Sequence, residues 1–171
     1  MAVIFAGCGS PQPKEPVEDG AFTTKLDGYQ RQIDKVISEN DELKSLKVTE
    51  SKSSEIDSEI VYIIYMEYDG EELGGLMIKT NDKGYIKSMY PVASEQIVVG
   101  KISAMMTAAF MALDSGLSYE EADDIAENIL DISLMGGDGV SKNGIKYDFL
   151  IESSGYYMWE AYPAENEVTD E

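Results

Sequence analysis

Residues 60–68 read Ile-Val-Tyr-Ile-Ile-Tyr-Met-Glu-Tyr, and they are the clearest indication of the fold class. Such a high density of β-branched and aromatic residues predicts a strand. Asp69-Gly70 is a turn signal, and residues 73–79 predict the partner strand. A second turn at residues 81–84 leads into a third strand over residues 85–90, followed by a proline. The sequence therefore predicts a three-stranded antiparallel meander.

Sequence typical of helices flanks the meander on both sides. Before it, apolar residues recur every three or four positions over residues 22–37, which predicts an amphipathic helix. After it, residues 94–113 predict a second helix, in which Lys101 is the only charge beyond position 96. We expect this helix to be buried on the sheet, and a transmembrane span is the alternative interpretation. Residues 118–121, Ser-Tyr-Glu-Glu, form a capping box that begins a third helix.

Two further strands are expected near the C-terminus, over residues 145–152 and 156–162. The element order α-βββ-αα-ββ predicts an α+β fold, with helices packed on one face of an antiparallel sheet of about five strands. Residues 62–70 and 147–155 share a Tyr, a Glu and a Gly at matching positions. We note this as a weak indication of an internal duplication.

The charge balance of the chain narrows the classes of partner. The 171 residues include 13 Lys and Arg against 33 Asp and Glu, for a formal net charge of −20. Nucleic acids and anionic lipid surfaces both require a basic patch, so we expect neither as a partner. A basic protein or peptide suits this charge better.

The absence of histidine and the presence of one cysteine exclude several kinds of site. With no His in the sequence, His-based catalytic triads, His general bases and His metal ligands are impossible. A single Cys permits neither an intrachain disulfide nor a Cys-rich zinc site. We expect no cofactor and no metal site, because the acidic residues show no EF-hand spacing.

The N-terminal residues 4–8 read Ile-Phe-Ala-Gly-Cys. This segment resembles the lipobox of bacterial lipoproteins, in which an apolar residue and two small residues precede a lipidated cysteine. The resemblance covers only about the first ten residues and carries no information on the fold. It implies that Cys8 carries a lipid and becomes the mature N-terminus, outside the cytoplasmic membrane. Membrane attachment is then expected only through that lipid.

The resemblance also sets the expected organisation of the chain. Residues 1–7 are expected to be a remnant of a signal segment, and residues 8–21 a polar, Pro-rich tether. A single α+β domain follows over residues 22–163, within which the polar residues 39–58 are expected to form a helix end and a solvated connection. The acidic residues 164–171 are expected to be a disordered tail.

Paired carboxylates are the one catalytic arrangement that the composition permits. Glu67 and Glu152 both lie near the end of a predicted strand, and Glu160 lies in the last one. Two of them could act as acid and base if the strands brought them together. Solvated carboxylates are the more common outcome in so acidic a chain, and we expect no catalytic residues.

The last predicted strand is the best candidate for a binding surface, because its sequence is Tyr-Tyr-Met-Trp-Glu-Ala-Tyr over residues 156–162. Strand alternation places Tyr157, Trp159 and Ala161 on one side and Glu160 and its even-numbered neighbours on the other. One side must face the helices, and aromatic rings on an open side would form a binding platform. We name Tyr157 and Trp159 as the candidate binding residues.

Together these features predict a small, lipid-anchored extracytoplasmic protein with a non-catalytic binding role. The expected ligand class is a protein, a peptide or an envelope polymer. Two alternatives remain open, namely a carboxylate-based hydrolase at the cell envelope and a structural protein that self-associates through its sheet edge or its aromatic strand.

Overall fold

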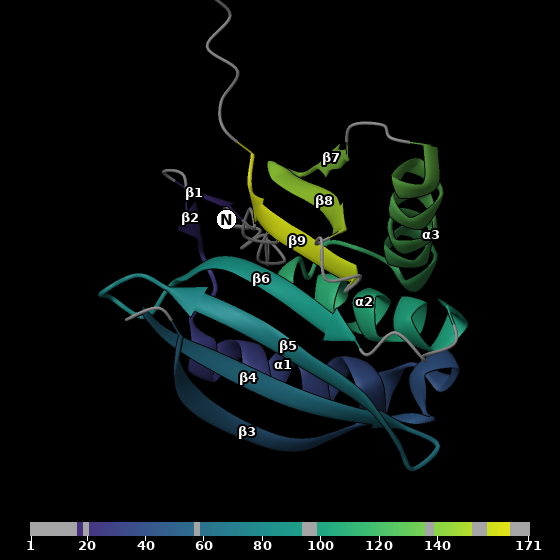
Figure 1. The fold of residues 1–171 in the computed structure, drawn as a ribbon, viewed down its shortest axis with the longest axis horizontal. Coiled ribbons are helices and arrows are strands. Elements are labelled where there is room, and N and C mark those ends of the chain that lie inside the picture. Colours follow the sequence, from purple (N-terminus) through teal and green to yellow (C-terminus); the bar gives the residue numbers. More distant parts are fainter. Residues whose placement is uncertain are drawn as a thin grey trace, which may run out of the picture.

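A seven-stranded, wholly antiparallel sheet forms the centre of the computed structural model (Figure 1). The structure describes residues 17–18, 21–56, 59–93, 99–135, 139–151 and 157–164. In spatial order the strands are β3 (Leu46–Ile56), β4 (Glu59–Tyr68), β5 (Glu71–Thr80), β6 (Ile86–Ala93), β9 (Tyr157–Pro163), β8 (Ile145–Ile151) and β7 (Val140–Lys142).

Three helices pack on one face of this sheet, which confirms the α+β class (Figure 1). They are α1 (Leu26–Glu39), α2 (Val99–Leu113) and α3 (Tyr119–Met135), and α2 lies between the other two. The core between helices and sheet contains Tyr29, Phe110, Tyr147 and Trp159, all with at most 1% of their surface exposed. Burial of these large side chains is a main source of the stability of the fold.

All five predicted strands are present, but the prediction of about five strands is wrong because each edge of the sheet carries one more. β3 occupies most of the polar stretch that we expected to be a solvated connection. As an edge strand it contributes few apolar side chains to the core, so Ser, Lys and Glu fill its other positions. β7 has only three residues before the turn at Asn143-Gly144, where both residues have positive φ (53° and 75°). This geometry is typical of the two-residue turns of β-hairpins.

The predicted helices differ from the observed ones mainly at their N-termini. α1 begins at Leu26 rather than near Phe22, because Phe22 belongs to β2 (Ala21–Phe22) and its side chain enters the core. β2 pairs with β1 (Val17–Glu18), so part of the segment that we expected to be a tether forms a strand. The rest of that segment and residues 165–171 lie outside the described residues.

The capping box at the start of α3 is confirmed. The Glu121 backbone N–H donates to Ser118 Oγ over 3.2 Å, and the Ser118 N–H donates to Glu121 Oε2 over 3.0 Å. α2 has 15 residues, and no helix among the described residues is long and apolar enough to cross a membrane.

The weak internal similarity falls on equivalent positions in the fold. α1 is followed by the meander β3-β4-β5, and α3 is followed by the meander β7-β8-β9. Tyr62 lies in β4 and Tyr147 in β8, so each belongs to the middle strand of its meander. One meander begins with β3 at one edge of the sheet, and the other begins with β7 at the opposite edge. An internal duplication remains a prediction.

Candidate functional site

The two faces of β9 have different environments, and this corrects the sequence prediction of the binding residues. Trp159 and Ala161 point into the core, where 1% and 0% of their surfaces are exposed. The prediction that Trp159 provides an exposed ring is therefore wrong, since this is the side of β9 that faces the helices. Tyr157 lies in β9 opposite Ile151, but its side chain lies outside the described residues, as do Cys8 and Glu152.

The opposite side of β9 belongs to the face of the sheet on which none of the three described helices packs (Figure 1). Glu160 and Tyr162 are half-buried on this side. β8 places Asp148 directly opposite Glu160, and β6 places Tyr90 opposite Glu160 from the other side. We call Tyr90, Asp148, Glu160 and Tyr162 the open-face cluster. Three strands thus contribute to one surface, and β6 lies far from β8 and β9 in the sequence.

Hydrogen bonds fix the side chains of the open-face cluster. Tyr162 Oη donates to Asp148 Oδ2 over 3.4 Å, and Ser88 Oγ donates to Tyr90 Oη over 3.1 Å. Burial raises the pKa of the Tyr90 phenol, and the neighbouring Glu160 carboxylate raises it further through a hydrogen bond and its charge. Tyr90 therefore stays neutral and serves as a donor to Glu160.

The cluster combines two kinds of group that bind cations. Asp148 and Glu160 place two carboxylates directly opposite each other on neighbouring strands, an arrangement that favours a nearby cation. Lys146 of β8 lies opposite Tyr162 on the same face. Tyrosine faces attract ammonium and guanidinium groups, and Lys79 Nζ already lies 5.9 Å from the centroid of the Tyr90 ring. An arginine or lysine side chain of a partner matches both features.

A second surface adds negative potential near the start of α3. The pKa of Tyr119 is raised by burial first, and then by the charges of Asp123 and Glu42. These carboxylates come from α3 and from the short helix η1 (Asp41–Leu43). Acidic groups on several elements favour long-range attraction of a basic partner.

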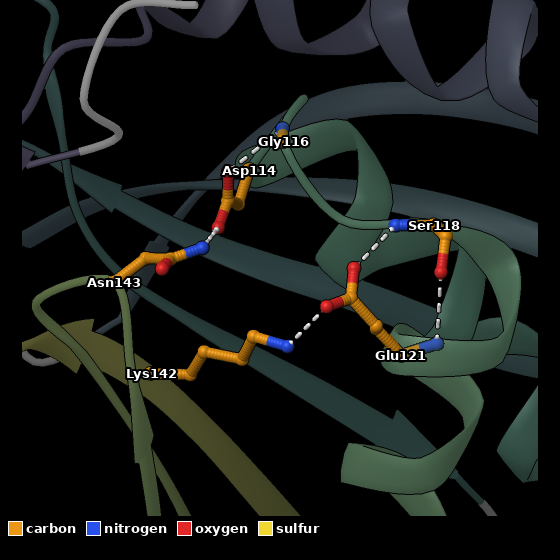
Figure 2. A network of polar contacts seen from close by, with 6 residues as sticks. All are labelled: Asp114, Gly116, Ser118, Glu121, Lys142 and Asn143. Atoms are coloured by element: carbon orange, nitrogen blue, oxygen red, sulfur yellow. Dashed lines mark hydrogen bonds and ion pairs between the residues drawn. The ribbon is translucent and has the colours of Figure 1, made fainter.

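A buried carboxylate, Asp114, connects two turns and has a structural role (Figure 2). It is 2% exposed, and its oxygens accept hydrogen bonds from the Gly116 N–H (2.9 Å) and from Asn143 Nδ2 (2.6 Å). The loop between α2 and α3 is thereby linked to the turn between β7 and β8.

Figure 2 shows a second link between the same two regions. Lys142 Nζ donates to Glu121 Oε1 over 2.7 Å, joining β7 to the capping box of α3. This hydrogen bond, and then the one from the Ser118 N–H, lowers the pKa of Glu121. Both carboxylates in the figure are thus engaged with protein donors, and we assign them to the fold rather than to a ligand.

The predicted catalytic pair is not supported by the topology. Glu67 lies near the C-terminal end of β4, beside the edge strand β3. Its carboxylate forms an ion pair with Lys47 Nζ of β3 at 3.3 Å. Glu152 would follow β8, and three strands separate β4 from β8. The sheet register instead places Glu67 opposite Glu72 of β5, and Asp148 of β8 opposite Glu160 of β9. Finding the pair of Asp148 and Glu160 from sequence would have required the β8–β9 register.

Within the described ranges, no group of three or more Asp, Glu, His or Cys side chains is placed to hold a metal ion. Asp123 of the acidic helix instead accepts a hydrogen bond from Thr107 Oγ1 of α2 over 3.1 Å. Comparisons of the chain with protein-family models, with curated proteins and with solved structures found no match.

Proposed function

We propose that this chain is a lipid-anchored extracytoplasmic protein that binds a basic protein or peptide, without catalysis, through the open-face cluster. The observation that carries the binding role is the pair Asp148 and Glu160, placed opposite each other between Tyr90 and Tyr162. The net charge of −20 supports a basic partner, because it attracts cations from a distance and repels anions.

The lipid attachment is supported by the lipobox-like residues before Cys8. Nine residue steps separate Cys8 from Val17 of β1, so this segment spans at most about 30 Å. The ordered domain would therefore be held close to the membrane surface. A cationic protein or peptide arriving from outside is the class of partner that this position and this charge favour.

Binding can be measured with a fluorescent oligoarginine peptide by anisotropy at low ionic strength. We expect Glu160→Gln and Asp148→Asn each to weaken binding about five- to tenfold, because each removes one charge from the pair and keeps the side-chain shape. Binding should also weaken as salt is added.

Matched controls separate a defined site from general charge attraction. Asp124→Asn and Glu127→Gln make the same changes on exposed positions of α3, away from the cluster. We expect both to bind the peptide within about twofold of the wild type. An equal loss in all four variants would contradict the open-face cluster as the site.

The lipid attachment has an independent test. In a bacterial host, with the native upstream sequence, the wild type should incorporate a labelled fatty acid and the Cys8→Ala variant should incorporate none. The binding assay needs no lipid, so the two halves of the proposal can fail separately. A wild type that incorporates no label would mean that Cys8 is not lipidated. The proposed location outside the cytoplasmic membrane would then have no support.

A carboxylate-based hydrolase is the second candidate, and the proximity of Asp148 to Glu160 is the observation that favours it. Two carboxylates on facing positions are the arrangement used for acid and nucleophile or base in glycoside hydrolysis. This alternative predicts turnover of an envelope glycan that Glu160→Gln abolishes. The binding role predicts no turnover by either protein.

A further inference from the structure

The edge strand β3 is unusually long for an unpaired edge. It has 11 residues, whereas β7 at the opposite edge has three. Figure 1 shows β3 as the outermost strand, with no described element beyond it. Its residues from Thr49 to Ser53 are all exposed. Such an edge offers a row of backbone donors and acceptors to another strand.

The charges on β3 are arranged symmetrically about Ser51. Glu50 and Lys52 flank it, both pointing to the open face of the sheet, where they lie opposite Tyr65 and Ile63 of β4. They are 60% and 48% exposed, and their charged atoms lie 3.6 Å apart. The symmetry is confined to this pair, because a bulge between Val48 and Glu50 interrupts the strand before it.

This symmetry makes the strand complementary to a second copy of itself. When two β3 strands pair antiparallel about Ser51, Glu50 of each copy lies opposite Lys52 of the other. Registers centred on residue 50 or 52 would instead place two glutamates or two lysines opposite each other, which is unfavourable. Charges on edge strands usually prevent pairing, but here they select one register.

We propose that two copies of this chain associate through their β3 strands, antiparallel and centred on Ser51, to form a continuous sheet of fourteen strands. A two-fold axis perpendicular to the sheet relates the copies, as in other isologous dimers. This axis leaves both open-face clusters on the same side of the joined sheet. The dimer therefore presents two clusters to one partner surface, which raises apparent affinity for a multivalent basic ligand. The pairing itself depends on neither the lipid nor the basic partner.

The test uses the full chain in sedimentation velocity over a wide concentration range. The wild type should shift reversibly from monomer to dimer as the protein concentration rises. Lys52→Glu places glutamates opposite each other and Glu50→Lys places lysines opposite each other, so each variant alone should weaken association about tenfold or more. Mixed in equal amounts, these two variants should recover association, because every facing pair is then of opposite charge.

Lys35→Glu on the exposed face of α1 is the matched control, since it makes the same charge change on a side chain that is 68% exposed. It should associate like the wild type. Recovery in the mixture also shows that both variants are folded. A wild type that stays monomeric at all concentrations, or single variants that associate as well as the control, would overturn the proposal.

Discussion

Replacing Trp159 with alanine is expected to lower the free energy of unfolding by about 3 to 5 kcal/mol. The indole is 1% exposed and lies in the main core cluster, so its removal leaves a cavity that the neighbouring helices cannot fill. The loss is measurable by urea unfolding followed by circular dichroism. Since Trp159 is the only tryptophan, its fluorescence gives a second signal for the wild type.

Ile60→Ala is the control for this prediction. Ile60 is a large apolar side chain with 64% of its surface exposed, and its truncation should cost less than about 1 kcal/mol. An effect of Trp159→Ala as small as that of Ile60→Ala would contradict the core position. It would instead favour the exposed ring that the sequence alone suggested.

The strands in the middle of the sheet could be predicted from local composition, because strands with one or both faces buried are rich in β-branched, aromatic and other apolar residues. β4 is an example, since eight of its ten residues are Ile, Val, Tyr or Met. β3 could not be recognised in this way, because its backbone is paired on one side only and Ser, Lys and Glu occupy most of its positions. The sequence does contain Asn143-Gly144, which is a signal for the β7–β8 turn. The strand before it, β7, is too short to be recognised from its composition.

The candidate site was less predictable than the fold, because it depends on pairing between distant strands. Alternation separates Trp159 from Glu160 and Tyr162, but both sides of β9 contain aromatic residues, so composition does not tell which side faces the helices. β6 and β9 are neighbours in space although α2 and α3 lie between them in sequence. Only this non-local pairing brings Tyr90 to Glu160.

The same glycine-to-alanine change is expected to have opposite effects at two positions. At Gly28 in α1, a Cβ would have no atom within 4 Å, and glycine is a poor helix former. Gly28→Ala should therefore raise the free energy of unfolding by up to about 1 kcal/mol, by restricting the unfolded chain and favouring the helix.

At Gly139, directly before β7, a Cβ would collide with backbone atoms of β8. It would overlap the Tyr147 carbonyl oxygen and lie 2.9 Å from the Asp148 Cα, and neither atom can rotate away as a side chain can. Gly139→Ala should lower the free energy of unfolding by about 3 kcal/mol, measured by urea unfolding beside Gly28→Ala. The strain falls on the backbone that carries Asp148, so folded Gly139→Ala should also bind the oligoarginine peptide more weakly than Gly28→Ala. A stability equal to that of the wild type would mean that Gly139 and β7 lie farther from β8 than the structure places them.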